Sequence, residues 1–412
     1  MLNGLACRAC GQSLENVFVD LGMSPLSNAY VRGDQLQQME PFYPLKVYVC
    51  AHCFLVQLPA VATPEQIFTD YAYFSSFSDT WLQHAKSYCD QMVARFGFGA
   101  SHQVIEVASN DGYLLQYFRD LGVPVLGIEP AANVARAAEE RGVPTIVKFF
   151  GAQTADELNR IGKAADLLVG NNVLAHVPDI NDFVEGIART IKAGGICTLE
   201  FPHLFKMMER NEFDTIYHEH FSYLSLYTVE GLFASHNLTV FDVDELPTHG
   251  GSLRVYGRRA DRDRPAVSKR VHDLRDREGN AGVDKLETYA GFADRVHSTK
   301  RRLLEFLIEA KNDGKRVVGY GAPAKGNTLL NYCGIRTDLI EFTVDRSPHK
   351  QGLFLPGTRI PIYAPERIFE TRPDYVLVLP WNLKDEIVQQ MHRVTEWGGK
   401  FVVPIPSLEV VA

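Results

Sequence analysis

Between Val104 and Phe201 the sequence alternates short apolar runs with amphipathic segments, and this alternation restricts the possible folds more than any other feature. The apolar runs predict strands that start at Val104 and Val125 and that span 144–147, 166–170 and 196–201. The segments between them predict helices at 131–140, 153–161 and 181–191. Strands that alternate with helices form a parallel sheet covered on both faces. We therefore expect a doubly wound α/β domain with its ligand at the carboxyl ends of the strands.

Small and polar residues follow these predicted strands, where a cofactor would lie. The candidate cofactor residues are Glu106 in the first strand, Ala108, Asn110, Asp111 and Gly112 in the turn after it, Glu129 and Pro130 after the second strand, and Asn171 and Asn172 after the fourth. A carboxylate at Glu129 would bind the two hydroxyls of a ribose. A dinucleotide fingerprint would require three glycines in the first turn, and their absence leaves less room for a pyrophosphate. The ordered set resembles the class I methyltransferases that use S-adenosylmethionine, and an NAD-binding fold is the rival interpretation.

Four of the seven cysteines form two Cys-x-x-Cys pairs, Cys7/Cys10 and Cys50/Cys53. Four sulfurs in two such turns predict a closed tetrahedral site for structural Zn²⁺, with no open position for catalysis. The N-terminus lacks the pattern of a secretion signal, so a metal explains the pairs better than disulfides. Four reduced thiols or a redox dithiol remain as alternatives, and we interpret His52 as a bystander between two ligands.

The stretch Tyr217-His218-Glu219-His220 follows the last predicted strand of this domain and concentrates titratable side chains. Histidine carries protons near neutral pH, and a neighbouring carboxylate can orient its ring. A polar loop that caps the sheet is the structural alternative. Further candidates are His176 after the fourth strand, the phenols of Tyr71 and Tyr73 before a helix predicted at 81–96, and the His249-Gly250-Gly251 turn between the predicted strands 238–243 and 252–256.

A second strand–turn–helix unit begins at Arg316, after a charged segment (258–278) read as a solvated linker or helix face and a predicted helix at 290–311. We expect Val296, Leu303, Leu304, Leu307 and Ile308 to form the inward face of that helix. The small-residue turn 319–328 at a helix start is a natural anion site, and Lys325 adds a positive charge beside Asn327. Asp345 ends the next strand and precedes Lys350, and further strands are predicted at 375–379 and 401–403. This α/β domain would suit a nucleotide diphosphate.

Length and composition limit the remaining possibilities. A chain of 412 residues is long enough for two or three domains, and its 46% apolar content is typical of globular proteins. The net charge of −8 argues against general nucleic-acid binding, and no apolar run is long enough to span a membrane. We therefore expect a cytoplasmic protein without nucleic-acid or membrane partners, as a monomer or weak oligomer.

Taken together, these motifs resemble the zinc-containing sugar C-methyltransferases of deoxysugar biosynthesis over nearly the whole chain. The resemblance rests on the paired Cys-x-x-Cys, Asn-Asp-Gly in the first turn, Tyr-x-Glu-His, His-Gly-Gly and Gly-Tyr-Gly-Ala-x-Ala-Lys. It implies four parts: a zinc module at 1–70, an S-adenosylmethionine domain at 71–257, a linker and helix at 258–312, and an α/β nucleotide-sugar domain at 313–412.

The resemblance also implies a substrate and roles. The substrate would be a dTDP-linked 4-keto-6-deoxysugar that is methylated at the carbon next to its ketone. Catalytic roles would fall on Tyr71, His176, Tyr217, Glu219 and His220, with His220 as the base. Tyr73, His249, Gly250, Lys325, Asn327 and Lys350 would bind the substrate. His218 departs from the family pattern and leaves the identity of the base open between two histidines.

Two other functions are compatible with the sequence. The chain could methylate oxygen or nitrogen of a sugar or small metabolite, or it could be a non-catalytic binder of nucleotide sugars.

Overall fold

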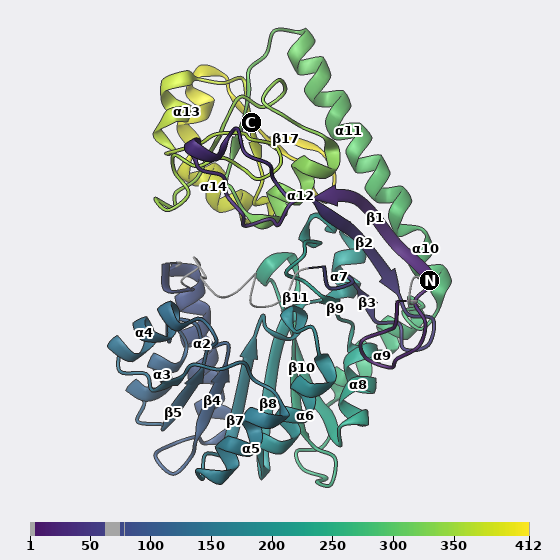
Figure 1. Cartoon of the computed structure of the whole chain (residues 1–412), viewed down its shortest axis with the longest axis vertical. Coiled ribbons are helices and arrows are strands. Elements are labelled where there is room, and N and C mark those ends of the chain that lie inside the picture. The colour runs from purple at the N-terminus through teal and green to yellow at the C-terminus, as the bar shows by residue number, and fades with distance from the viewer. Residues whose placement is uncertain (1–4, 62–74, 78, 412) are drawn as a thin grey trace. The chain divides into compact units, whose positions relative to one another are not determined.

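The computed structural model describes residues 5–61, 75–77 and 79–411, which form two compact units. Unit 1 comprises 1–15, 50–204 and 221–285, and unit 2 comprises 16–49, 205–220 and 286–412. Figure 1 shows the chain coloured from its N-terminus to its C-terminus. The chain therefore enters each unit more than once. The four sequence domains expected above remain predictions.

A seven-stranded sheet with the order β10-β11-β8-β7-β4-β5-β6 forms the centre of unit 1 (Figure 1). Its strands are β4 (Val104–Val107), β5 (Val125–Ile128), β6 (Thr145–Ile146), β7 (Ala165–Asn171), β8 (Ile191–Pro202), β10 (Leu238–Leu246) and β11 (Ser252–Arg259). The neighbouring strands β8, β7, β4, β5 and β6 are parallel to one another. Strand β11 pairs antiparallel with both β8 and β10. The doubly wound α/β domain predicted from the alternation is confirmed.

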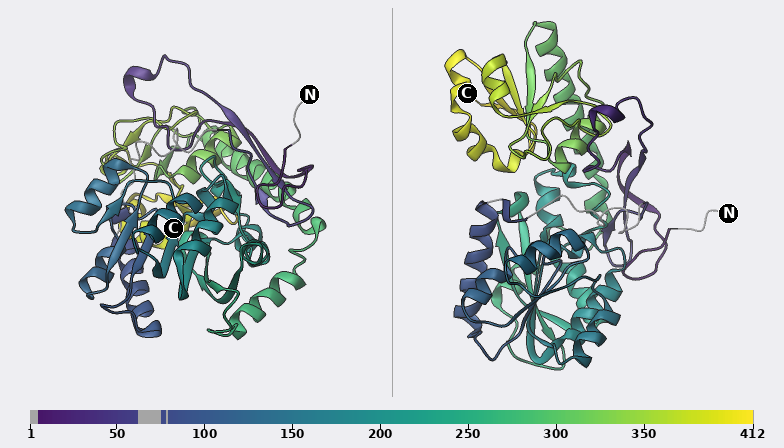
Figure 2. Two further views of the ribbon diagram at one scale, coloured as in Figure 1. Left: turned by 60° about the horizontal axis from the view of Figure 1, so that its bottom comes forward. Right: turned by 60° about the vertical axis from the view of Figure 1, so that its left-hand side comes forward.

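Helices pack on both faces of this sheet (Figure 2). They are α2 (Asp79–Phe96), α3 (Leu115–Asp120), α4 (Ala132–Glu140), α5 (Ala152–Arg160), α6 (Ile180–Thr190) and α8 (Leu226–Ser235). On one face, Tyr88 and Met92 of α2 and Phe118 of α3 join strand residues such as Val169 in a buried core. These side chains are the apolar positions of the helical pattern, so burial of that face holds the helices in place.

Residues 192–195 lie inside the long strand β8, where its pairing with β7 is irregular. Ala165 of β7 pairs with Ile191, whereas Leu167 already pairs with Ile196, so the intervening residues bulge out of the ladder. A Cβ at Gly195 would lie 2.6 Å from the Ala165 carbonyl oxygen, which is why only glycine fits there.

Short elements complete unit 1 around this sheet. Strand β3 (Val56–Gln57) pairs antiparallel with β9 (Ser222–Tyr223), and the 3₁₀ turns are η2 (Ser75–Phe77), η3 (Leu174–His176) and η5 (Thr248–Gly250). The charged segment after β11 contains α9 (Lys269–Asn280). The prediction that this segment is solvated was wrong for Glu278, which is buried and accepts hydrogen bonds from the amides of Leu226 and Tyr227 at 2.9 Å. Its carboxylate thus caps the start of α8.

Unit 2 contains a second sheet with the order β14-β13-β12-β15-β16-β17, parallel except for β17. Its strands are β12 (Val317–Tyr320), β13 (Thr343–Val344), β14 (Ile362–Tyr363), β15 (Tyr375–Val378), β16 (Lys400–Val403) and β17 (Glu409–Val411), with helices α12 (Ala324–Cys333), α13 (Glu366–Thr371) and α14 (Lys384–Gln390) and the 3₁₀ segments η6 (Trp381–Leu383) and η7 (His392–Trp397). The strand–turn–helix unit predicted at Arg316 is therefore confirmed.

An antiparallel hairpin also belongs to unit 2. It consists of β1 (Asn16–Ser24) and β2 (Tyr43–Val49), with η1 (Gly33–Gln35) between them. The ring of Phe18 on β1 stacks on Phe292 of α11 (Phe292–Asn312), which follows α10 (Leu286–Ala290), with ring centroids 4.4 Å apart. The predicted inward face of α11 is correct for Val296, Leu303 and Leu307, which are buried, and wrong for Ile308, which is 49% exposed.

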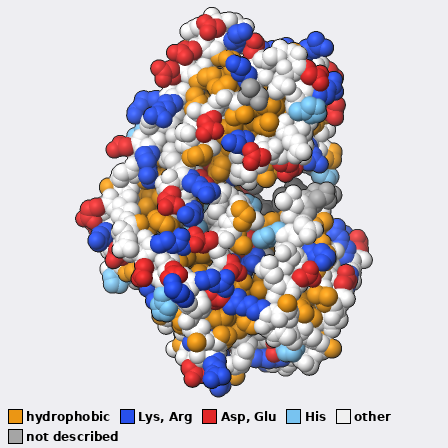
Figure 3. All heavy atoms as spheres, turned by 180° about the vertical axis from the view of Figure 1, so that it is seen from behind, with side chains coloured by type: hydrophobic (Ala, Val, Ile, Leu, Met, Phe, Trp, Pro, Cys, Tyr) orange, Lys and Arg blue, Asp and Glu red, His pale blue; other side chains and the backbone are white. Residues whose placement is uncertain are grey.

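Charged side chains of both signs are interspersed on the molecular face seen in Figure 3. Many form ion pairs, such as Arg275 with Glu230 and Arg277 with Glu245. Among the described residues, no helix combines the length and apolar character needed to cross a bilayer.

Candidate active site

The four paired cysteines converge in unit 1 as a candidate metal centre. The Sγ atoms of Cys7, Cys10, Cys50 and Cys53 all lie within 4.8 Å of one another, and the Cys7–Cys53 and Cys10–Cys50 distances are both 3.5 Å. Four sulfurs placed tetrahedrally at ~2.3 Å from a zinc ion would be roughly 3.8 Å apart, so the donor set fits the metal. The Gln57 amide donates to Cys7 Sγ at 3.1 Å, which favours a thiolate. The cysteines can therefore hold Zn²⁺ in a closed site.

Hydrogen bonds tie the first cysteine turn to the sheet domain of the same unit. Arg8 donates from Nη1 to the Pro178 carbonyl at 2.9 Å. Asn181 in turn donates from Nδ2 to the carbonyls of Arg8 and Ala9 at 2.8 and 3.1 Å. The segment that follows β7 is thus braced by the cysteine turn.

The turn after β4 has an unusual backbone. Ala108, Asn110 and Gly112 all have positive φ values, of 54°, 49° and 77°. A Cβ at position 112 would lie 3.0 Å from Cγ2 of Val143, so glycine is required both by φ and by space. This turn directly follows the carboxyl end of β4, where a cofactor-binding turn is expected.

Glu129, at the end of β5, fixes this turn. Its Oε2 accepts from the Asn110 amide at 3.0 Å and its Oε1 accepts from the Ala131 amide at 2.9 Å. Each carboxylate oxygen keeps a second lone pair, which can accept from a ribose hydroxyl as expected. The carboxylate of Asp111 pairs with Arg141 at 2.6 Å, and Pro130 leads from Glu129 into α4.

Several buried polar atoms at this edge have no partner among the described residues. They are Oε2 of Glu106, both amide atoms of Asn171, and Oδ1 of Asn172. Burial raises the pKa of Glu106 well above its usual range. Buried polar groups are normally hydrogen-bonded, so orphaned ones mark a place where a polar ligand belongs. The edge of the unit 1 sheet therefore fits the predicted polar cofactor.

His176 and His249 lie at the same edge of unit 1. His176 closes η3, which follows β7, and the Ala175 carbonyl accepts from the Phe221 amide at 2.8 Å. His249 has a φ of 55° beside Gly250, and its Nε2 lies 3.4 Å from Nδ2 of Asn172. The residue that follows His220 in the chain is thus held at the carboxyl end of β7. Tyr71 and Tyr73 lie outside the described residues.

In unit 2 the two histidines of the central stretch have different surroundings. His218 is 2% exposed, its Nε2 donates to the Pro44 carbonyl at 3.3 Å, and its ring lies edge-on to Tyr43 of β2. His220 donates from Nδ1 to the Thr215 carbonyl at 2.8 Å. When Nδ1 carries the hydrogen, Nε2 is the nitrogen that can accept a proton. His220 has the geometry of a base, whereas His218 packs against the hairpin.

Tyr217 and Glu219 lie close to His220 in the sequence. The Tyr217 ring lies 4.0 Å from that of His220 by centroids. Glu219 accepts from Nδ2 of Asn28 at 2.6 Å, and burial raises the pKa of its carboxyl to about 7. The Thr215 carbonyl therefore takes the orienting part that we expected from Glu219.

The central stretch is anchored to the helix of the second predicted site. Thr328 of α12 donates to the Ile216 carbonyl at 2.9 Å, and Trp381 Nε1 donates to Asp214 at 2.7 Å. Lys325 lies over the Trp381 ring, 4.4 Å from its centroid, and donates to Asn382 at 2.8 Å.

Asn327 and Lys350 border the same turn of unit 2. Asn327 donates to the Ser27 carbonyl at 2.6 Å, and its Oδ1 has no partner among the described residues. Lys350 donates to the Ala322 carbonyl at 2.9 Å. Asp345 accepts from the Ala322 amide at 2.7 Å, so this amide of the predicted anion turn is already occupied. Unit 2 thus gathers Lys325, Asn327 and Lys350 around the start of α12.

Burial of acids in this stretch predicts a pH-dependent stability. Burial and the nearby Asp214 raise the pKa of Glu212 to about 8. Because of this raised pKa, Glu212 binds its proton more tightly in the folded state than in the unfolded state. The stability that protonated Glu212 contributes is fully present below about pH 4.5 and is lost as the pH rises through 8. The free energy of unfolding of the parent should fall when the pH is raised from 5.5 to 8.5. Because glutamine cannot ionise, we expect this fall to be smaller by a few kcal/mol in Glu212→Gln. Urea unfolding at both pH values measures the difference.

Glu209→Gln is the control for this prediction, because Glu209 is exposed on α7 (Leu204–Glu209). Its pH dependence should equal that of the parent. If Glu212→Gln and the parent lose the same unfolding free energy between the two pH values, Glu212 ionises normally in the folded state.

A buried charge cluster in unit 1 was missed by sequence reasoning. Glu200 of β8 contacts His84 of α2 at 3.1 Å and Arg254 of β11 at 2.6 Å. These residues are far apart in sequence, and the available signal was a single charged residue inside each apolar strand, as in Leu199-Glu200-Phe201. Burial would raise the pKa of Glu200, but the hydrogen bond from His84 and the charge of Arg254 lower it to about 2.

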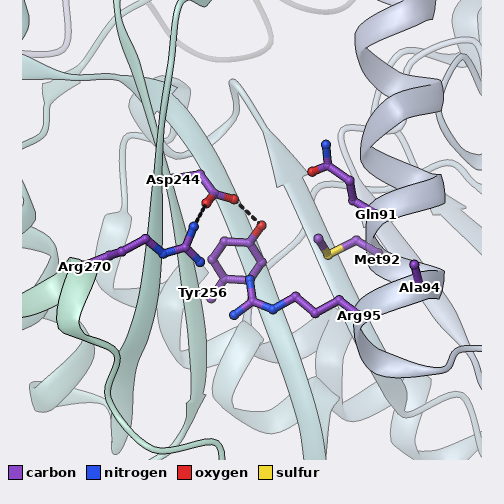
Figure 4. Close-up of a pocket in the computed structure, with 7 residues that line it drawn as sticks. All are labelled: Gln91, Met92, Ala94, Arg95, Asp244, Tyr256 and Arg270. Atoms are coloured by element: carbon purple, nitrogen blue, oxygen red, sulfur yellow. Dashed lines mark hydrogen bonds and ion pairs between the residues drawn. The ribbon is translucent and has the colours of Figure 1, made fainter.

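A pocket of about 530 Å³ lies elsewhere in unit 1, between α2, β10, β11 and α9 (Figure 4). Its polar groups contact one another: Asp244 accepts from the Tyr256 hydroxyl at 2.6 Å and pairs with Arg270 at 2.5 Å. A charged ligand would have to break these pairs, so we assign no role to this pocket.

Comparison with known proteins agrees with this arrangement. Three family models match: a zinc binding domain at residues 7–68, a methyltransferase domain at 81–243 and a C-methyltransferase C-terminal domain at 247–406. The chain is 38% identical to C-methyltransferase NovU of Streptomyces niveus over 409 residues. The alignment covers 98% of this chain and 96% of that protein.

More distant similarities cover smaller parts of the chain. The ubiquinone biosynthesis O-methyltransferase of Methylobacterium sp. (strain 4-46) is 32% identical over 97 residues, which are 23% of this chain and 38% of that protein. The magnesium protoporphyrin IX methyltransferase of Synechocystis PCC 6803, solved with bound SAM, is similar with a TM-score of 0.34 at 14% identity over 47% of this chain and 88% of that one.

Proposed function

Because the chain belongs to the family of zinc-containing, S-adenosylmethionine-dependent C-methyltransferases, we propose that its methyl acceptor is a nucleotide-linked 4-keto-deoxysugar. The methyl group would go to the carbon next to the ketone, and dTDP is the nucleotide that the sequence resemblance implies. A cytoplasmic location and a monomer or weak oligomer remain predictions.

His220 is the proposed base, and the observation that carries the proposal is its hydrogen bond to the Thr215 carbonyl at 2.8 Å. This bond assigns the ring hydrogen to Nδ1 and leaves Nε2 to take a proton. A carbon-bound proton beside a ketone is acidic enough for imidazole because the resulting carbanion delocalises onto oxygen as an enolate. The amide of Phe221, the next residue, is held by Ala175 at the carboxyl end of β7.

Hydrogen-bond donors would stabilise the enolate oxygen. Tyr217, whose ring lies 4.0 Å from that of His220, is the first candidate, and His176 and Tyr71 are the others. A preorganised donor of this kind contributes roughly 3 to 4 kcal/mol to lowering the barrier. Burial raises the pKa of Glu219 to about 7, so its protonated carboxyl could also donate a hydrogen bond to the enolate oxygen.

The start of α12 would bind the nucleotide diphosphate. Lys325 and Lys350 supply positive charge at this turn, and the helix dipole favours an anion there. The amide of Ala322 is occupied by Asp345, so the first-turn amides of α12 and the lysines would carry the binding.

S-adenosylmethionine, when bound, supplies a methyl group on a sulfonium. Glu129 would accept from its ribose hydroxyls, and Glu106, Asn171 and Asn172 would meet its other polar groups. We expect Asn171→Ala to weaken S-adenosylhomocysteine binding about tenfold to hundredfold, because the amide is buried and has no partner among the described residues. Calorimetry measures the affinity, and an unchanged affinity would remove Asn171 from the cofactor site.

Mass spectrometry of a panel of nucleotide 4-keto sugars incubated with S-adenosylmethionine tests the proposed acceptor. A gain of one methyl group on a member of the panel supports the proposal. Methylation of none of them, by a protein that binds S-adenosylhomocysteine in calorimetry, would reject this acceptor class.

A further inference from the structure

The buried cluster of Glu200, Arg254 and His84 lies at the carboxyl edge of the unit 1 sheet. Glu200 is in register with Asn171 of β7 on one side and with Arg254 of β11 on the other. Asn171 is one of the predicted cofactor residues, so the cluster is one strand away from that site. The side chains of Glu200 and Arg254 are 0% and 2% exposed. Charges are costly to bury, and this cost calls for a role beyond stability.

Glu200 holds three elements together. Its carboxylate contacts Nε2 of His84 on α2 at 3.1 Å from both oxygens, Nη2 of Arg254 on β11 at 2.6 Å, and Oγ1 of Thr248 on η5 at 3.2 Å. Thr248 directly precedes His249, a predicted substrate residue with a left-handed φ of 55°. The carboxylate therefore anchors both His84 and the His249 turn.

The contacts assign the hydrogen on the His84 ring. His84 Nε2 lies 3.1 Å from both oxygens of Glu200, closer than the 3.3 Å that separates it from Nη2 of Arg254, which donates one of its two hydrogens to Glu200. An ionised carboxylate is an acceptor only, so Nε2 must carry the hydrogen that points at it. In the neutral ring the lone pair then resides on Nδ1. A carboxylate that holds one ring nitrogen and leaves the other as acceptor is the arrangement of a functional histidine.

The His84 ring also belongs to a cluster of contacting aromatic rings. It stacks on Trp81 with centroids 5.0 Å apart, and Trp81 in turn stacks on Tyr113 and lies edge-on to His249 at 5.5 Å. The side chain of His84 keeps 19% exposure, whereas its two charged partners are sealed. The ring is thus held by Glu200 and Trp81 and remains partly exposed.

We propose that His84, positioned by Glu200, accepts a hydrogen bond through Nδ1 from a hydroxyl of the methyl acceptor. This inference rests on the proposed function and deepens it, because it specifies an acceptor with a hydroxyl within reach of the unit 1 sheet edge. Glu200 is a positioning residue in this arrangement, and Arg254 balances its charge.

Two substitutions of His84 separate this role from a structural one. The amide nitrogen of a glutamine side chain takes the place of Nε2, so His84→Gln can keep the bond to Glu200 while it loses Nδ1. We expect His84→Gln to reduce kcat/KM for the acceptor about tenfold to hundredfold, mainly through KM. S-adenosylhomocysteine affinity should stay unchanged. His84→Asn, whose amide oxygen replaces Nδ1, should retain more activity than His84→Gln. His102→Gln, before β4, is the control and should match the parent.

The measurements use the full chain and the panel sugar that it methylates. If one ring hydroxyl of the acceptor binds His84, an acceptor that lacks this hydroxyl should show a smaller difference in kcat/KM between His84→Gln and the parent. Equal kcat/KM for the folded His84→Gln variant and the parent would overturn the proposal. So would a gap that stays the same for every deoxy acceptor tested.

Nitrogen NMR of ¹⁵N-histidine protein gives a readout without turnover. The resonances lost in His84→Gln should show a hydrogen on Nε2 and none on Nδ1. A hydrogen on Nδ1 of the neutral ring would overturn the proposal. If no panel sugar is methylated, the proposed acceptor class fails and this tautomer measurement decides the assignment alone.

Discussion

His220→Asn is expected to lower kcat by about 10²–10⁴-fold while S-adenosylhomocysteine binding stays within a factor of two or so of the parent. The reason is that the variant lacks Nε2, the nitrogen left to accept a proton when Nδ1 donates to the Thr215 carbonyl. An asparagine amide can keep the bond to Thr215, so the fold of the loop should survive. Single-turnover kinetics with the methylated panel sugar measures the loss, and calorimetry measures cofactor affinity.

His218→Gln is the matched control for this prediction. His218 is two residues away in the same loop, but its Nε2 donates to the Pro44 carbonyl and its ring packs against Tyr43. We expect a folded His218→Gln variant to keep kcat within about tenfold of the parent. A larger loss in His218→Gln than in His220→Asn would transfer the role of base to His218.

Removal of the metal is expected to unfold the cysteine module, defined as residues 5–15 and 50–58 of unit 1. Zinc contributes on the order of 10 kcal/mol to small zinc domains, which have little apolar core of their own. Cys10→Ser should therefore lose stoichiometric zinc and show an early unfolding transition in urea. The contacts of Arg8 and Asn181 should carry the effect to the segment after β7 and weaken S-adenosylhomocysteine binding.

His52→Ala is the control for the metal prediction. His52 is exposed between Cys50 and Cys53 and is not a member of the sulfur cluster. Its variant should keep one zinc per chain by elemental analysis and unfold like the parent. Full zinc content in Cys10→Ser, or lost zinc in His52→Ala, would contradict the four-sulfur site.

Much of unit 1 could be predicted because its signals are local. The parallel strands of the sheet contain short apolar runs, and the acid or amide at their carboxyl ends, such as Glu129 or Asn171, is adjacent to the run in sequence. The cysteine pairs are equally local, since the Cys-x-x-Cys spacing alone brings two thiolates together. Parallel strands then place all these ends at one edge, so the candidate cofactor site followed from pattern and topology.

Contacts between distant segments could not be predicted. Glu200 meets His84 and Arg254 only after three elements pack together, and no local pattern in the sequence connects the three residues. Likewise Asn28, in the long connection between β1 and β2, bonds to Glu219 across 191 positions. Sequence periodicity reports which face of an element is buried but not which polar side chains meet there.

Exchange of a carbon-bound substrate proton with deuterated water, in the absence of S-adenosylmethionine, tests the central claim most directly. The parent should wash deuterium into the position beside the ketone of the methylated panel sugar, and His220→Asn should not. Exchange that persists in His220→Asn would show that another group removes the proton. A parent that methylates the sugar on carbon without any exchange, even with S-adenosylhomocysteine bound, would contradict a separate deprotonation by the histidine.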